Sequence, residues 1–199
     1  MRKKIGIILI AAGLSIVAYF GYEWWEQRQV IQSMSASELN DYLEYDDKVL
    51  DSESLPNEDV ENNFEKGEEM AELKIPSIEQ KYPVYWGTDE ETLTQGVGMH
   101  ESEWTVTPEE NGHTLLSGHR DTVFTEMGDL KIGDLIYVDY EGKEYAYQIR
   151  ELFIVEEDDK SVVVEKDQAG LTISTCYPFQ FVGDAPYRYI VEADLVKAE

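Results

Sequence analysis

The order of apolar and polar residues divides the chain into three parts. Residues 5–22 are mostly apolar and carry no charge, whereas residues 26–70 are polar and acidic. After residue 70, short runs of β-branched and aromatic residues such as ELKIPSI, HTLLSG and SVVVEK alternate with Gly, Pro, Asp and Asn. Runs of this kind are typical of an all-β sandwich or barrel. The pattern predicts an N-terminal helix in residues 1–25, a stalk or linker in 26–70 and one β-rich domain in 71–199.

The apolar run in residues 5–22 has the length of a membrane-spanning helix. Its 18 residues would rise about 27 Å as an α-helix, close to the hydrocarbon thickness of about 30 Å of a bilayer. Basic residues 2–4 precede the run and Tyr22, Trp24 and Trp25 end it, as is typical at membrane interfaces. A cleaved signal peptide is the main alternative, but the flank YFGYEWWEQ has no small-x-small cleavage site. We expect an uncleaved anchor with a cytoplasmic N-terminus and with the rest of the chain outside.

Local patterns add several short elements to this outline. The sequence SASE at 35–38 has capping-box spacing, and apolar residues follow at roughly helical intervals, which predicts a short helix over about 36–50. The next stretch, DSESLPNEDVENNFEKGEE, is acidic and poor in apolar residues, as in a linker. In the β-rich domain, EGK at 141–143 predicts a hairpin turn, and short helices fit residues 89–98 and 121–129.

Acidic residues dominate the charge of the chain outside the anchor. The formal net charge of −26 is divided as +3 for residues 1–22, −12 for 23–71 and −17 for 72–199. Such a surface repels phosphate backbones, which argues against nucleic acid as a partner, and it offers no polybasic patch to anionic lipids. We interpret the acidic residues as a solvated surface. Divalent-cation binding is the alternative, although their spacing assembles no specific calcium site.

Cys176 is the only cysteine of the chain, so outside the cytoplasm it cannot form an internal disulfide. It is either a small buried apolar residue or a thiol kept for its reactivity. Cys176 follows the predicted strand LTIST, and Arg188 lies in YRYIVEADL, the strand predicted after the next loop. If the two strands are antiparallel neighbours, Cys176 and Arg188 face each other at the mouth of that loop. His119 likewise follows a predicted strand, HTLLSG.

These three side chains together would suit acyl transfer. A cysteine thiolate is the nucleophile in such reactions, and a nearby His or Arg favours its formation. His119 can pass a proton to a leaving amine, and the guanidinium of Arg188 can donate to a developing oxyanion. By residue type alone the set is weak, because any chain with one Cys and three His offers a similar one. An inert Cys176 in a non-enzymatic wall or receptor module is therefore an alternative.

The other two histidines have simpler interpretations. His113 lies in a predicted strand. A histidine at such a position most often has a structural role with its ring nitrogens hydrogen-bonded. His100, in GMHES, is expected in a surface loop. His113 and His119 are not accompanied by an HExxH or CxxC motif, so we expect neither a metal site nor a cofactor.

Three motifs of the β-rich part resemble those of the sortases, the membrane-anchored cysteine transpeptidases of Gram-positive bacteria. They are HTLLSGHRDTVF, TISTCYPF and a later YR, in this order behind an apolar anchor. The stretch KIPSIEQKYPVYWGTDEETLTQGVGMHESEW is most similar to the class D branch, and the resemblance covers roughly residues 71–197. It implies a closed eight-stranded β-barrel with Cys176 as nucleophile, His119 as proton carrier and Arg188 at the oxyanion. Thr175 would help to shape the substrate pocket, and the family's TLxTC signature is TISTC here, which keeps an apolar side chain.

The resemblance also implies a reaction and its partners. Cys176 would attack the Thr carbonyl of a Leu-Pro-x-Thr-type sorting signal in a secreted protein, and His119 would protonate the leaving amine. The thioester would be resolved by an amine of a lipid-linked peptidoglycan precursor, which attaches the protein to the cell wall. An exported cysteine peptidase, which transfers the acyl group to water, would use the same three residues and is the alternative.

One short motif in the stalk suggests a second role for it. Residues 54–58, SLPNE, begin like a sorting signal that lacks its Thr. The segment would be either a lid that folds back over the substrate groove or, as is more common for Pro in a polar stretch, a linker turn.

Overall fold

The described part of the chain consists of an N-terminal helix, a short connecting segment and a β-barrel. The computed structural model describes residues 2–42, 49–56, 63–180 and 183–199. Its helices are α1 (Arg2–Arg28), α2 (Ala36–Tyr42) and α3 (Glu90–Gln95), with 3-10 turns η1 (Pro76–Ile78), η2 (Met127–Asp129) and η3 (Lys160–Val162). Its strands are β1 (Gln32–Ser33), β2 (Glu69–Ile75), β3 (Gln80–Trp86), β4 (Val97–Met99), β5 (His113–Gly118), β6 (Leu135–Tyr140), β7 (Lys143–Glu156), β8 (Gly170–Tyr177) and β9 (Tyr187–Ala198).

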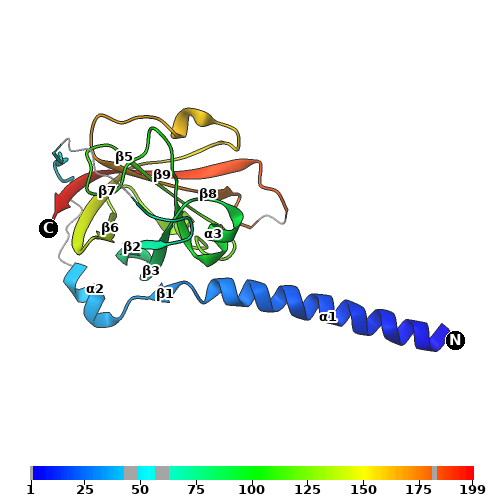
Figure 1. Ribbon diagram of the computed structural model, residues 1–199. Coiled ribbons are helices and arrows are strands. Elements are labelled where there is room, and N and C mark those ends of the chain that lie inside the picture. The colour runs from blue at the N-terminus through cyan, green and yellow to red at the C-terminus, as the bar shows by residue number, and fades with distance from the viewer. Residues whose placement is uncertain (1, 43–48, 57–62, 181–182) are drawn as a thin grey trace.

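Strands β2 to β9 form one sheet that closes on itself. Their order is β3-β2-β6-β7-β9-β8-β5-β4, and β4 pairs again with β3, so that eight strands make a barrel (Figure 1). Most neighbours are antiparallel, but β5 is parallel to β8, and β3 is parallel to β4. The predicted closed eight-stranded β-barrel is confirmed. The two-residue β1 is added outside it, on the part of β3 that holds Gln80 and Lys81.

Apolar side chains from alternate strand positions fill the barrel. In β8, Leu171 and Ile173 are fully buried in this core, so Ser174 and Cys176 project from the opposite, outer face of the strand. In the neighbouring β5, Leu116 belongs to the core and the residues on either side of it face outward. The outer faces of β5 and β8 therefore make one continuous surface, and Cys176 lies at its end.

The hairpin turn predicted at 141–143 is confirmed. Strands β6 and β7 are antiparallel and are joined by Glu141 and Gly142, whose φ angles are +51° and +78°. Left-handed backbone at both central positions suits the twist of the two strands. The helix expected over 89–98 is present as α3, and the side chain of Asp89 caps it by accepting a hydrogen bond from the backbone N–H of Thr92 at 3.2 Å.

The prediction of a helix over residues 121–129 is wrong in its extent, because only η2 at the end of this range is helical. The backbone N–H groups of Val123 and Phe124 both donate to the carbonyl of His119, at 3.0 and 2.8 Å. The resulting turn places both apolar side chains in the barrel core, where they are fully buried. Burial of these two side chains overrides the local helix preference.

The described part of the predicted stalk lies against the barrel. Its helix, α2, begins with the predicted capping box, in which the Ser35 N–H donates to Glu38 Oε2 at 2.7 Å. The helix ends at Tyr42, whereas Leu50 is not helical, and residues 43–48 lie outside the described part. The predicted helix over about 36–50 is thus present but shorter.

Residues just before and at the start of the SLPNE motif lie against the barrel. The N–H of Glu53 donates to the carbonyl of Leu195 at 2.7 Å, and Leu55 packs against the barrel core. Asn57 and Glu58, the last two residues of the motif, lie outside the described residues. Leu195 is seven residues along β9 from Arg188, so this contact lies toward the other end of the barrel from the predicted catalytic residues.

Helix α1 has its last turns beside the barrel and extends away from it as a rod (Figure 1). Among the described residues it is the one helix long and apolar enough to cross a membrane, and none of its apolar window is buried. Leu9 and Val17, for example, are 67% and 71% exposed. A core helix of a soluble protein would be covered by other elements, so this exposure is consistent with the expected anchor.

Candidate active site

Cys176 and Arg188 are direct neighbours across two antiparallel strands. Strands β8 and β9 pair over eight residues, and their register places Cys176 opposite Arg188. On the other side of β9, Val155 of β7 pairs with Arg188, so the position is held from both sides. Opposed residues of an antiparallel pair lie about 5 Å apart and project from the same face. The predicted pairing of the two strands is confirmed by this register.

His119 reaches the same place from a strand that is distant in sequence. Strand β5 is parallel to β8, and their last paired residues are Gly118 and Thr175. His119 follows Gly118 directly, as Cys176 follows Thr175, so the two residues lie side by side at the same end of the barrel. Near them, Nε2 of His119 is 3.8 Å from Oε1 of Glu90, at the start of α3.

A cavity of about 300 Å³ joins the three predicted side chains. Its lining residues are His119, Arg120, Asp121, Glu157, Cys176, Gly183, Asp184, Ala185 and Arg188. Cys176 is only partly buried, so its thiol is accessible from this cavity. A group bound here can therefore meet a thiol, an imidazole and a guanidinium at once.

The guanidinium of Arg188 is oriented by the backbone of the loop before it. Nη1 donates to the carbonyls of Ala185 and Tyr187 at 3.1 and 3.0 Å. On the other side, Nη2 is 3.7 Å from Oε2 of Glu157. Nη1 is thus bound to the loop and Nη2 lies near Glu157, which fixes the plane of the guanidinium, so that a bound oxyanion would be served by Nε or would replace Glu157 at Nη2.

Thr175 stabilises the strand beneath the site from the inner side of the barrel. It is 3% exposed, and its hydroxyl donates to the carbonyl of Gly118 at 2.7 Å. This bond ties β8 to β5 immediately before Cys176 and His119. Because side chains alternate along a strand, Thr175 points inward when Cys176 points outward. Any effect of Thr175 on the substrate pocket would act through the position of these two residues.

Arg120 is a buried residue of the cavity that sequence reasoning did not single out. It is 7% exposed, and its Nη2 donates to the carbonyl of Gly183 at 2.7 Å. It thereby connects the turn after β5 to the loop between β8 and β9. The only sequence signal was its place beside His119 in the GHR motif.

His113 lies at the other end of β5 and is held at both ring nitrogens. Nδ1 donates to the carbonyl of Val164 at 2.7 Å, and Nε2 accepts from the hydroxyl of Thr172 at 2.8 Å. The residue is fully buried. Burial, helped by the nearby cation of Lys166, lowers the pKa of His113 to about 4. The predicted structural role of His113 is confirmed by these contacts.

His100 is half-buried rather than exposed, and it lines a second cavity. This groove of about 550 Å³ also has Trp104, Val163 and Val164 in its walls. Burial lowers the pKa of His100. Among the described residues, no group of three or more His, Cys, Asp or Glu is arranged to hold a metal ion.

Comparison with known proteins decides the family. The profile of the sortase domain matches residues 73–196, which extend from β2 into β9. The chain belongs to the sortase family. This sortase is 34% identical to sortase D of Bacillus subtilis (strain 168) over 194 residues, which are 96% of this chain and 97% of that protein. The predicted resemblance to class D sortases is confirmed.

Solved structures of other sortases share the barrel. The catalytic domain of B. anthracis SrtD is 46% identical to this sortase, with a TM-score of 0.61 over 71% of this chain and 96% of that one. A sortase C of Clostridium perfringens, determined with the C-terminal cell wall sorting motif, is 31% identical, with a TM-score of 0.61 over 68% of this chain and 74% of that one. The predicted enzyme class, a cysteine transpeptidase of the cell wall, is confirmed by this membership.

Proposed function

We propose that this sortase is a membrane-anchored transpeptidase that cleaves a Leu-Pro-x-Thr-type sorting signal after Thr. It would then join the protein to an amine of a lipid-linked peptidoglycan precursor. The observation that carries the proposal is the convergence of Cys176, His119 and Arg188 on one cavity. The relative determined with a cell wall sorting motif supports the substrate class.

In the first step the thiolate of Cys176 attacks the carbonyl carbon of the Thr residue. The carbonyl electrons move to oxygen, and the guanidinium of Arg188 stabilises the oxyanion that forms. When the tetrahedral intermediate collapses, the C–N bond breaks and protonated His119 gives its proton to the leaving amine. The acyl group remains on Cys176 as a thioester.

In the second step the acceptor amine attacks the thioester. Neutral His119 removes a proton from the attacking nitrogen, and Arg188 again stabilises the oxyanion. The C–S bond breaks as the new amide bond forms, and Cys176 returns as a thiolate beside protonated His119. The cycle therefore needs no group beyond these three side chains and the two substrates.

The substrate would approach Cys176 along the outer face of β5 and β8. The groove lined by Trp104, Val163 and Val164 lies beside this face, since His113 on β5 bonds to the carbonyl of Val164. Its apolar walls suit the Leu and Pro side chains of a sorting signal, because such side chains gain from removal from water. An extended peptide in the groove would run toward the Cys176 end of β8.

Membrane anchorage through α1 would keep the enzyme close to both of its substrates. Proteins awaiting sorting and the lipid-linked precursor are held at the same surface as the enzyme. Confinement to one surface raises the effective concentration of each partner without any new contact.

The test uses the full chain in detergent micelles with a quenched Leu-Pro-x-Thr peptide library and an added amine. We expect cleavage after Thr and, by mass spectrometry, a product in which Thr is joined to the amine. Cys176→Ala should abolish both, and Arg188→Lys should lower kcat by about 10²- to 10³-fold, the usual effect of losing an oxyanion donor. Arg150→Lys, an arginine outside the cavity, is the matched control and should retain full activity.

Two results would contradict the proposal. Cleavage that survives Cys176→Ala would exclude Cys176 as the nucleophile. A free Thr carboxylate as the only product, even at high amine concentration, would show an exported peptidase instead of a transpeptidase.

A further inference from the structure

We propose that residues 29–42 and 49–56, together called the strap below, hold the barrel close against the membrane with the Cys176 end facing the lipid surface. The inference rests on the proposed membrane anchorage of α1 and adds the position and orientation of the catalytic end.

The strap is attached to the barrel within a few residues of α1. Strand β1 pairs with Gln80 and Lys81 of β3, and the N–H of Met34 donates to the carbonyl of Glu79 at 2.9 Å. The Met34 side chain is only 6% exposed. Residues from the last two turns of α1 also share a cavity with Tyr85 and α3, so this end of the helix lies next to the barrel.

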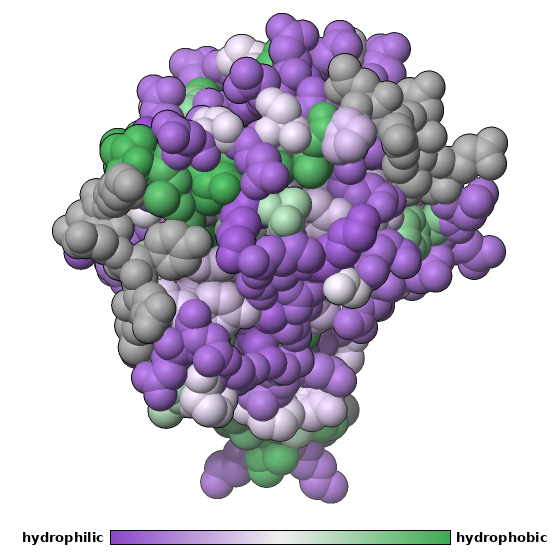
Figure 2. Space-filling model, turned by 90° about the vertical axis from the view of Figure 1, so that its left-hand side faces the viewer, coloured by the Kyte–Doolittle hydropathy of each residue, from purple (hydrophilic) through white to green (hydrophobic). Residues whose placement is uncertain are grey.

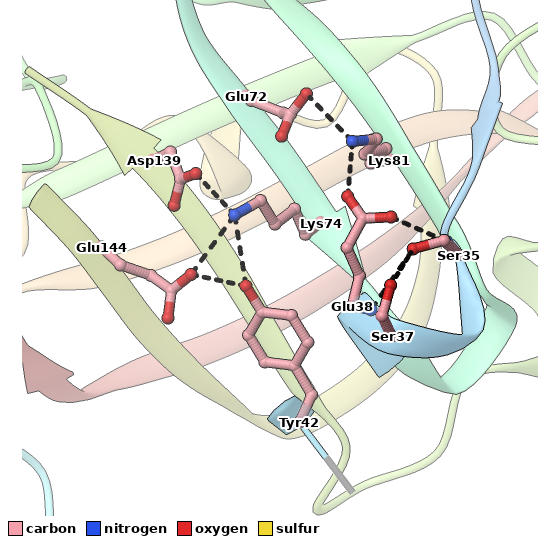
Figure 3. A network of polar contacts seen from close by, with 9 residues as sticks. All are labelled: Ser35, Ser37, Glu38, Tyr42, Glu72, Lys74, Lys81, Asp139 and Glu144. Carbon is pink, nitrogen blue, oxygen red and sulfur yellow. Dashed lines mark hydrogen bonds and ion pairs between the residues drawn. The ribbon is translucent and has the colours of Figure 1, made fainter. Parts of the chain in front are cut away.

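Helix α2 is held by an ion pair and its own capping box (Figure 3). Nζ of Lys81 donates to Oε1 of Glu38 at 2.8 Å, while Oε2 of Glu38 accepts from the N–H of Ser35. Hydrogen bonding from Lys81, followed by that from Ser35, lowers the pKa of Glu38 to about 2. Glu38 is therefore ionised and paired at all ordinary pH values.

Tyr42 at the end of α2 makes the second attachment (Figure 3). Its hydroxyl donates to Oε2 of Glu144 at 2.7 Å and accepts from Nζ of Lys74 at 3.2 Å. Its ring packs against Tyr137, with ring centroids 4.4 Å apart. Burial raises the pKa of Tyr42 to about 12, so the hydroxyl remains a donor.

The last part of the strap is bound at β7 and β9. The N–H of Leu50 donates to Oε1 of Gln148 at 2.8 Å, and the carbonyl of Leu50 accepts from Nη2 of Arg150 at 2.7 Å. Ser52 Oγ donates to Oδ2 of Asp194 at 3.0 Å. The strap is thus attached at its start, at α2 and near its end.

These attachments shorten the connection between membrane and barrel. A flexible linker of about 45 residues, the length of the predicted stalk, would have an end-to-end distance of about 35 Å. With the strap bound, only Gln29, Val30 and Ile31 separate the end of α1 from β1. The barrel therefore lies next to the membrane surface in which α1 is anchored.

The direction of α1 decides which end of the barrel faces the lipid. In Figure 1, α1 leaves the barrel on the side where the loop between β8 and β9 lies, and the C-terminus is on the opposite side. The end with the C-terminus is covered mostly by hydrophilic residues (Figure 2). The end that holds Cys176 is the one turned toward the membrane.

Aromatic side chains at the Cys176 end suit a lipid interface. Tyr177, Phe179 and Tyr189 form a partly buried cluster with ring centroids 5.3 to 6.3 Å apart, in which Phe179 and Tyr189 pack against the barrel core. Tyr187, which pairs with Tyr177, is 42% exposed at this end. Aromatic rings with polar tips are enriched where membrane and water meet. The partner of this end is therefore the bilayer surface that carries both substrates.

The test measures the height of each barrel end above the bilayer. A donor dye is placed in the full chain by Tyr187→Cys or by Lys143→Cys, both in a Cys176→Ala background, and the protein is reconstituted in phosphatidylcholine vesicles with acceptor dye on the headgroups. The 14 residues of β7 separate the two positions by about 40 Å, a distance that energy transfer resolves. We expect severalfold more transfer from position 187 than from position 143.

The strap is tested by Met34→Pro combined with Glu38→Ala and Tyr42→Ala, which removes its attachment beside β1 as well as those of α2. In this variant the energy transfer from position 187 should become similar to that from position 143, because the barrel then moves on a longer linker. Asn40→Ala with Asp41→Ala, two exposed residues of the same helix, is the matched control and should keep the difference. Cleavage of a soluble peptide by the strap variant with Cys176 intact should be unchanged, which shows that its barrel is folded.

Three results would overturn the inference. They are equal or greater transfer from position 143, an unchanged difference in the strap variant, and failure of the protein to float with vesicles. None of these depends on peptide cleavage, so failure of the orientation is distinguishable from failure of the proposed transpeptidase.

Discussion

At the scale of single residues, His119 and His113 show how position on one strand separates two roles. His119 is at the open end of β5, partly exposed beside Cys176, where the proposed proton carrier would have access to substrate. His113 is at the other end, buried, with a hydrogen bond at each ring nitrogen. Through its hydrogen bond to the carbonyl of Val164, His113 fixes the loop that lines the apolar groove. One histidine can take part in proton transfer, and the other maintains the site's shape.

The buried His113 should make stability depend on pH in a defined direction. Its folded-state pKa of about 4 is below the ordinary value, so the unfolded chain takes up a proton first as pH falls. The stability due to neutral His113 is complete above about pH 6.5 and is lost toward pH 4, by about 3 kcal/mol in all. Denaturant unfolding between pH 7 and 4 should show this loss in the wild type and not in His113→Gln.

The control for this effect is Asn40→Gln, an exchange of one exposed amide side chain for another, which should keep the pH dependence of the wild type. His113→Gln should also be less stable at pH 7 by about 1–3 kcal/mol, because it leaves a buried partner without its hydrogen bond. Parallel stability curves for wild type and His113→Gln would contradict the assignment.

At the scale of elements, the parallel pairing of β3 with β4 closes the barrel. Gly98 at the centre of β4 pairs with Tyr85 of β3 on one side and with Ser117 of β5 on the other. A Cβ at position 98 would lie 2.3 Å from the backbone carbonyl oxygen of Gly87 and 2.8 Å from Leu93. The closure therefore depends on the absence of a side chain at this position.

Gly98→Ala should consequently destabilise the barrel strongly. Because the obstructing atom belongs to the backbone, the strand must shift, which costs about 2–3 kcal/mol or more. Thermal unfolding should show a clearly lower Tm. Gly170→Ala in β8 is the comparison, since its closest contact would be 3.3 Å, and it should lower Tm much less. Equal effects of the two substitutions would refute this explanation of the closure.

The elements also show which parts of the site could be read from the sequence. The pairing of Cys176 with Arg188 was predictable, because β8 and β9 are consecutive strands joined by one loop. The place of His119 depends on β5 and β8 pairing in parallel across more than fifty residues, which no local pattern reveals. Its place at the end of a predicted strand made it a candidate, but the choice of His119 over His100 and His113 rested chiefly on the family resemblance. The binding of the strap was not foreseen either, because its charged contacts look like a solvated surface and few apolar residues mark them.

At the scale of the whole molecule, the strong negative charge lowers the stability of the folded state. Residues 72–199 carry a net charge of −17, so like charges repel across the barrel surface. Raising the NaCl concentration from about 10 to about 300 mM shortens the Debye length from about 30 Å to less than 10 Å. Tm should therefore rise by several degrees over this range. Sorbitol at equal osmolality is the control, and a constant or falling Tm in NaCl would show that ion pairs outweigh the repulsion.

The single accessible thiol has a consequence for the lifetime of the enzyme. Cys176 opens to a cavity and has no second cysteine in the chain. When a thiolate is oxidised to a sulfenic acid, a neighbouring thiol can capture it as a disulfide and protect it from further oxidation. This chain has no such resolving thiol, so an oxidised molecule depends on an external reductant and otherwise proceeds to the irreversible sulfinic acid. Exposure to oxidants would then inactivate molecules one by one, and activity would be renewed by synthesis of new chains.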